Sequence, residues 1–207
     1  MTNFGNDEGN WLTTDVCEEA VAAVEMTAEM AKRLPQDKYA WKWVVLSLHD
    51  ALQGFMVLAL SQGNGLLAST EKSREKWLEA YRKGEKFGDE RLDSFPNLYK
   101  KIKSEAMIAY VNSGRFEPSE TQDWAVNKLN ELRNNFVHFL PRTWMIEISG
   151  LPQICLDCLG IIQFLAWESG NILLHKEPLR DRAKRAMTDS RETFTELDSE
   201  FTQSGQS

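Results

Sequence analysis

The stretch LRNNFVHF, residues 132–139, places two side chains suited to phosphate chemistry in one predicted helix. Arg133 supplies a planar, permanently charged guanidinium that binds two phosphoryl oxygens at once. His138 follows five residues later and can exchange a proton near neutral pH. Together they are the minimum for cleaving a phosphodiester without a metal, because one stabilises the developing charge and the other moves a proton. The alternative is an arginine at the margin of the core and an ordinary surface histidine.

Helical geometry separates these polar residues from the core side of the segment. At about 100° per residue, one stripe holds Leu129, Leu132, Phe136 and Leu140. Arg133 falls about 40° from Leu129, at the edge of that stripe. Asn134 and His138 share the opposite face through their i, i+4 spacing. We therefore expect His138 to be exposed in a monomer.

A single helix aims Arg133 and His138 poorly at one phosphorus atom, since residues five apart diverge by about 140°. A two-fold dimer removes this difficulty by laying the helix against its own copy. Two copies of Arg133 and two of His138 would then converge in one cleft. The same contact would cover Val137, an apolar residue between them. The spacing thus favours a homodimer formed through this helix.

Other candidate sites have simpler structural explanations. Cys155 and Cys158 form a C-x-x-C pair, but no second pair exists, so we expect two small buried side chains and no metal site. His49 lies in an apolar helix and is interpreted as a core or interhelical hydrogen-bonding residue. His175 is expected at a helix C-terminus, where it faces the helix dipole. The glycines of SQGNGLLAS lack the order of a phosphate loop and are read as a helix stop.

Helical periodicity runs through almost the whole chain and positions these residues. Helices are predicted within residues 13–35, 37–65, 70–88, 94–110, 118–141, 151–175 and 178–201. The second is apolar on most faces and is expected to be the central core helix. In the third, Trp77, Leu78 and Tyr81 are expected to face inward. The fifth begins with Ser119 and Gln122 in a capping-box pattern. Residues 142–150 are expected to be extended.

The predicted fold is therefore all-α, a helical bundle with peripheral helices. We expect a disordered leader at 1–13, one domain at 14–201 and a disordered tail at 202–207. Neither a signal peptide nor an uninterrupted membrane-spanning run is visible, which predicts a soluble, cytoplasmic protein. The net charge of −7 argues against broad nucleic-acid binding, yet residues 71–103 hold ten Lys or Arg against seven Asp or Glu. This segment is the natural track for an RNA backbone if it lies beside the Arg133 helix.

The run LRNNFVHF resembles the motif of HEPN (higher eukaryotes and prokaryotes nucleotide-binding) domains. That motif is an arginine, a small polar residue and a histidine about four to six positions after the arginine, late in a bundle helix. Arg133, Asn134 and His138 match it in that order. The wider run LNELRNNFVHFLPRTW and the apolar helix SLHDALQGFMVLAL are also similar to bacterial HEPN-type proteins. The resemblance spans most of residues 15–175 and implies an HEPN-like bundle that dimerises through the motif helix.

The resemblance further implies a metal-independent endoribonuclease that needs no cofactor. Attack by the RNA 2′-hydroxyl would leave a 2′,3′-cyclic phosphate and a 5′-hydroxyl. His138 would be the general acid or base, Arg133 would stabilise the phosphorane, and Asn134 would orient them. Family members often act as toxins or in defence against phage, so we expect an antitoxin or sensor protein as a partner.

Two other functions stay open. Some HEPN domains keep the fold without catalysis, so a helical interaction or regulatory module is the main alternative. A small-molecule or nucleotide binder is the third, although no phosphate loop is visible. Cleavage of RNA in EDTA distinguishes the first function from the others.

Overall fold

A computed structural model describes residues 11–61, 65–108, 110–138, 141, 143–174 and 177–204. In this part of the chain seven α-helices, joined by short 3₁₀ and π turns, form a helical bundle without β-strands. The helices are α1 (Val16–Ala31), α2 (Ala40–Leu60), α3 (Glu71–Lys83), α4 (Phe95–Ile102), α5 (Glu120–Val137), α6 (Leu151–Gln163) and α7 (Glu177–Ser204). The all-α fold class is therefore confirmed.

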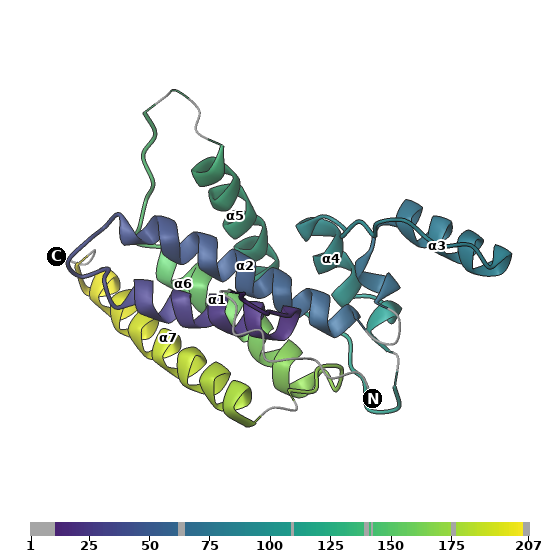
Figure 1. Ribbon diagram of the computed structural model, residues 1–207. Helices are drawn as coiled ribbons and strands as arrows, with labels where there is room; N and C mark the ends of the chain where they lie inside the picture. The colour runs from purple at the N-terminus through teal and green to yellow at the C-terminus, as the bar shows by residue number, and fades with distance from the viewer. Residues whose placement is uncertain are drawn as a thin grey trace.

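Helix α2 occupies the centre of the bundle, as its apolar sequence predicts (Figure 1). Thirteen of its 21 residues are buried, and it packs against α1, α4, α5 and α6. Within the described residues it is the one helix that is long and apolar enough to cross a membrane, and 56% of its most apolar window is buried in the protein. A helix surrounded on most sides by other helices needs such a sequence to fill the core.

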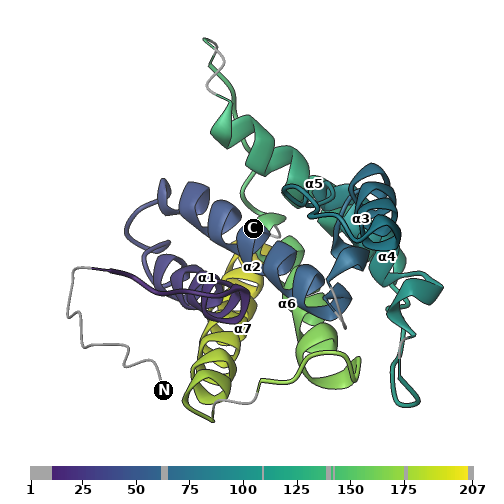
Figure 2. The ribbon, with the colours of Figure 1, turned by 45° about the vertical axis from the view of Figure 1, so that its right-hand side comes forward.

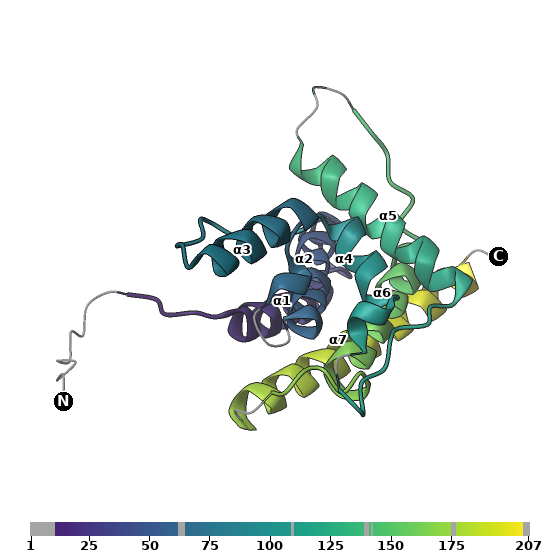
Figure 3. The ribbon, with the colours of Figure 1, turned by 90° about the vertical axis from the view of Figure 1, so that its right-hand side faces the viewer.

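Helices α1 and α2 form an antiparallel pair, and α7 packs against α1 and α6 on the side away from α5 (Figures 1 and 3). Asp15 begins α1 by accepting a 2.9 Å hydrogen bond from the backbone N–H of Glu18. The two helices approach closely at Gly54, where a Cβ atom would lie 2.8 Å from the Cβ of Ala20. On the outer side, Arg182 of α7 binds Glu18 at 2.9 Å and Glu25 at 2.7 Å. These contacts fix the half of the bundle that supports α2.

The other half consists of α4, α5 and α6, and it carries the motif helix. Ser119 and Gln122 form the predicted capping box at the start of α5. The buried residues of α5 end with Leu132, so the last turn extends beyond the core. In Figures 1 and 2 the C-terminal end of α5 points away from the bundle. The fold thus presents residues 133–138 at a free end.

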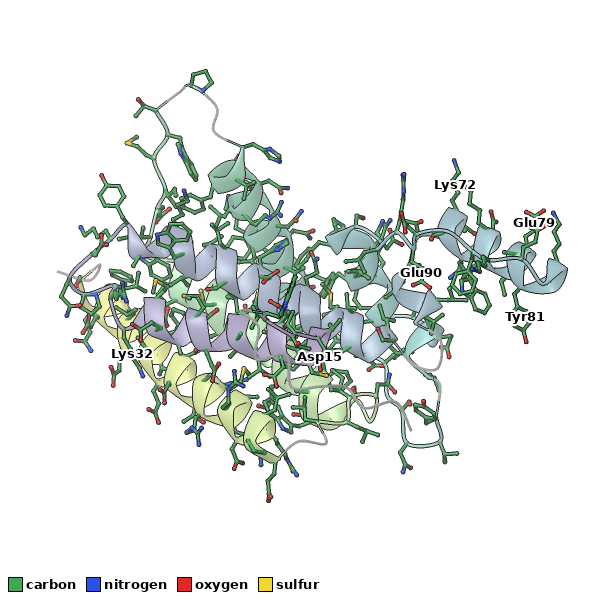
Figure 4. All side chains as sticks on the ribbon, viewed as in Figure 1. Asp15, Lys32, Lys72, Glu79, Tyr81 and Glu90 are labelled. Atoms are coloured by element: carbon green, nitrogen blue, oxygen red, sulfur yellow. The ribbon has the colours of Figure 1, made fainter. Side chains whose placement is uncertain are left out.

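Helix α3 projects from the body as an arm (Figure 1). A short backbone pairing of Ser69 with Leu92 holds its base. The prediction that Trp77, Leu78 and Tyr81 face the core is wrong, because no residue of α3 is buried. Trp77 instead stacks on Tyr81 at 5.3 Å and packs on Phe87 at 5.1 Å, between ring centroids. Lys72, Glu79 and Tyr81 all lie out on this arm, as Figure 4 shows.

Several predicted boundaries also differ from the structure. The helix expected over 94–110 ends at Ile102, and a 3₁₀ turn, Glu105–Met107, follows. The helix expected over 151–175 widens into a π turn at Phe164–Glu168 and stops before Gly170, whose positive φ of 71° ends it. Residues 143–148 form neither a helix nor a paired strand. Helix α7 runs to Ser204, three residues past the predicted domain boundary, and the division into leader, domain and tail stays a prediction. Gly63, Phe139, Leu140 and His175 lie outside the described residues.

Candidate active site at the C-terminal end of α5

Arg133 and Asn134 lie side by side in the last two turns of α5. Both are partly exposed, and the Arg133 Nη1 donates a 3.1 Å hydrogen bond to the Asn134 Oδ1. Among the residues that the structure describes, no carboxylate lies within ion-pair distance of Arg133. Its positive charge is therefore unneutralised at a solvent-accessible position, which suits a guanidinium that binds an anion.

Arg133 faces the middle of α2, where it influences two titratable groups. Its charge helps to lower the pKa of His49, after the larger effect of burial, and it opposes the raised pKa of Asp50. Asp50 reaches solvent at the edge of α2, yet the loss of water on its protein side raises its pKa, and Glu19 of α1 acts in the same direction. The motif arginine thus has two titratable neighbours, both on α2.

His49 connects α2 to α5 beneath the motif. Its Nε2 lies 3.2 Å from the Oδ1 of Asn130, and its ring stacks on Phe95 of α4 with centroids 4.0 Å apart. Burial, the largest effect, together with the charge of Arg133 lowers its pKa to about 4, although the Asn130 hydrogen bond acts in the opposite direction. The ring is therefore neutral at pH 7, and Nε2 must carry its proton to donate to an amide oxygen. His49 is the interhelical hydrogen-bonding residue that the sequence predicted.

His138 ends α5 and remains exposed, as expected for one chain. Its backbone N–H donates a 2.9 Å hydrogen bond to the carbonyl oxygen of Asn134. Its side chain has no hydrogen-bond or ion-pair partner among the described residues. The single chain thus brings the side chains of Arg133 and Asn134 together, but no hydrogen bond joins the His138 side chain to either of them.

Apolar residues are exposed at this end of α5 and in the segment that follows it. The exposed fraction is 39% for Val137 and 95% for Met145. Trp144 packs edge-on against Phe136 with ring centroids 5.0 Å apart, which attaches the segment after α5 to the helix. The chain itself therefore leaves Val137 partly exposed.

The structure also shows which residues sequence reasoning missed. Asn130 and Asp50 join the motif neighbourhood, and neither was singled out. Asn130 stands four residues before Asn134, so the helical repeat alone places the two amides on one face. The two successive polar residues, His49 and Asp50, in an otherwise apolar helix were the available signal for a polar contact with α5.

The prediction that Cys155 and Cys158 are buried side chains is confirmed. Cys155 and Cys158 are both buried in α6, and burial raises the pKa of each thiol well above its usual value. A thiol that stays protonated is a poor metal ligand and a poor nucleophile. Nowhere in the described ranges do three His, Cys, Asp or Glu side chains gather as a metal site would need.

Comparison of the chain with protein-family models, curated proteins and solved structures finds no match. The case for a function therefore rests on the chemistry of α5 and its neighbours.

Proposed function

We propose that the protein is a metal-independent endoribonuclease of HEPN type that acts as a homodimer. The observation that carries the proposal is the unneutralised guanidinium of Arg133, hydrogen-bonded to Asn134 and five residues before the exposed His138. A permanent charge that forms no ion pair among the described residues suits a phosphate, and an exposed imidazole suits proton transfer.

In the proposed reaction the 2′-oxygen of the RNA attacks the adjacent phosphorus. The bond between 2′-oxygen and phosphorus forms, the bond from phosphorus to the 5′-oxygen breaks, and a 2′,3′-cyclic phosphate results. One His138 accepts the proton of the 2′-hydroxyl, and the departing 5′-oxygen takes a proton from solvent water. Arg133 stabilises the extra negative charge on the phosphorane, and Asn134 orients the guanidinium through its 3.1 Å hydrogen bond.

The dimer is part of the proposal because one chain does not supply the complete site. The free end of α5, with Val137 and the nearby Met145 exposed, offers an apolar surface for a second copy. A two-fold contact there places the same residues of both copies around one axis. The cleft would then hold two guanidinium groups and two imidazoles.

The direct test incubates purified protein with RNA in EDTA. We expect cleavage by the wild type, and losses of about 10²- to 10⁴-fold for His138→Ala and for Arg133→Ala. Arg82→Ala is the matched control, because it removes the same side chain from the exposed α3 arm. Substrate with a 2′-deoxy sugar at the cleavage position should resist the enzyme. Cleavage that survives both motif substitutions would reject the proposed site.

We also propose that RNA cleavage by this protein serves as a toxin or phage-defence activity in the cytoplasm, restrained by a separate antitoxin or sensor protein. Growth arrest on induction, relieved by Arg133→Ala, is the cellular test. Growth unaffected by the wild-type chain, made in soluble and RNA-cleaving form, would argue against toxicity.

The α3 arm supports a second candidate function, a non-catalytic interaction module. Its aromatic group of Trp77, Tyr81 and Phe87 packs on itself, and Tyr81 is 69% exposed. Exposed aromatic side chains on a projecting helix are typical of a protein contact. Failure of the wild type to cleave any RNA, in preparations free of bound protein, would favour this second function.

A further inference from the structure

A groove of about 240 Å³ lies between α4 and α5 and continues the face of α5 that carries Asn134. Asn127 and Asn130 line it from α5, and Lys100 lines it from α4. Asn130 precedes Asn134 by one helical turn and Arg133 by three residues, or about 4.5 Å along the axis. The groove therefore leads directly to the motif.

Two donors of the groove, the Lys100 ammonium and the Asn130 amide N–H, have no acceptor among the described residues, whereas Asn127 donates to the Asp123 carbonyl oxygen at 2.8 Å. Asp123, its one carboxylate, accepts a 2.7 Å bond from Lys103 and a 2.9 Å bond from the Tyr99 hydroxyl. Lys100 is exposed and forms no ion pair within the described part of the chain. With the acid already neutralised, Lys100 gives the groove a net attraction for anions.

His49 determines which end of the Asn130 amide faces the groove. Because the Asn130 Oδ1 accepts from His49, the Nδ2 group is directed elsewhere and has no acceptor among the described residues. Phe95 holds the imidazole from the other side by stacking at 4.0 Å. His49 is thus a positioning residue that keeps Asn130 in place as a donor beside Arg133.

The aromatic residues of the groove do not provide a platform for bases. Phe95 is 6% exposed and Tyr99 is 5% exposed, so their ring faces are covered by protein. Stacking on a base needs an open ring face. The exposed chemistry is a lysine and amide groups, which fits the phosphate backbone and not the base.

We propose that the α4–α5 groove binds the RNA phosphate next to the scissile one, with Lys100 and Asn130 as donors and His49 as the residue that positions Asn130. This inference rests on the proposed ribonuclease function and adds the path of the strand. Lys100 belongs to the basic segment 71–103 and lies beside the motif helix, so this part of the segment would contact the RNA backbone.

The test measures binding of an RNA oligonucleotide with 2′-O-methyl sugars, which cannot be cleaved by attack of a 2′-hydroxyl, over a series of salt concentrations. Lys100→Ala should weaken binding several-fold and lower the salt slope by about one phosphate contact, equally for oligo-A and oligo-U. Lys184→Ala, which removes an exposed lysine of α7 on the side of the bundle away from α5, should bind as the wild type does. In the cleavage assay Lys100→Ala should raise KM and leave kcat unchanged.

The positioning role of His49 has its own readout. His49→Leu removes the donor to Asn130 and should raise KM. His49→Gln keeps an amide donor, so its KM should be close to that of the wild type. Wild-type binding and KM in Lys100→Ala, with cleavage intact, would overturn the groove and leave the nuclease proposal standing. An effect of Lys100→Ala that depends on the base would also overturn it. Binding that Lys100→Ala weakens, without cleavage by the wild type, would refute the nuclease proposal and reduce the groove to a site for the RNA backbone. No binding of the analogue by the wild type would refute both proposals.

Discussion

His49 predicts a specific dependence of stability on pH. Its pKa falls from 6.5 in the unfolded chain to about 4 in the folded protein, chiefly through burial. The unfolded state therefore binds a proton between these values while the folded state does not, so His49 destabilises the protein as pH falls through this window. Between pH 7.5 and pH 5.5 His49 lowers the free energy of unfolding by about 1.4 kcal/mol. At a pH well below both pKa values the decrease reaches its full value of about 3.4 kcal/mol.

Comparison of wild type with His49→Gln isolates this contribution. Glutamine cannot titrate, and the carboxylates are common to both proteins, so their contributions largely cancel in the difference. Asp50 has a raised pKa in the folded protein, so it stabilises the folded state as pH falls, opposite to His49. Because both proteins contain Asp50, its effect also largely cancels.

The assay is guanidinium unfolding of each protein at the two pH values. We expect the wild type to lose about 1.4 kcal/mol more than His49→Gln between them. Equal losses in the two proteins would refute the reasoning, because His49 would then titrate alike in the folded and unfolded chains.

Two further predictions concern packing. Gly54→Val should lower the free energy of unfolding by about 2 kcal/mol, because its side chain meets Ala20 at the α1–α2 contact, while Gly88→Val, at an open position, should change it little; chemical denaturation measures both. A thiol reagent should modify Cys17, which is partly exposed, well before Cys158, which is buried; equal rates in the native protein, followed by mass spectrometry, would contradict the placement of Cys158 in the core.

Local signals in the sequence predicted most of the helices. The capping box at Ser119 and Gln122 and the apolar faces of α2 each act within a few residues, and the structure has the elements where these signals place them. Helix ends without a strong local signal were less accurate. The sequence after Ile102 is compatible with a longer helix, yet α4 ends at Ile102 and a 3₁₀ turn follows.

The orientation of α3 could not be predicted from its own periodicity. The apolar stripe of α3 consists of Trp77, Leu78 and Tyr81. Such a stripe indicates that another part of a protein covers it, but it does not indicate which part. In the structure Phe87, just beyond the same helix, packs on Trp77. Trp77 therefore packs on a residue only ten positions away in the sequence and not on the core of the bundle.

The candidate site divides in the same way. Arg133, Asn134 and the exposure of His138 followed from spacing on one helix. The contact of His49 with Asn130 joins residues 81 positions apart and depends on how α2 and α5 cross. No local pattern specifies such a pair, so only the structure links His49 to the neighbourhood of Arg133.

A mixed dimer tests the central claim most directly. Arg133→Ala and His138→Ala chains carrying different tags are expressed together, and dimers that contain one of each are purified. Such a dimer retains one guanidinium and one imidazole, on opposite subunits. We predict that it cleaves RNA in EDTA while each parent homodimer does not. A mixed dimer as inactive as its parents would contradict a site that the two subunits share.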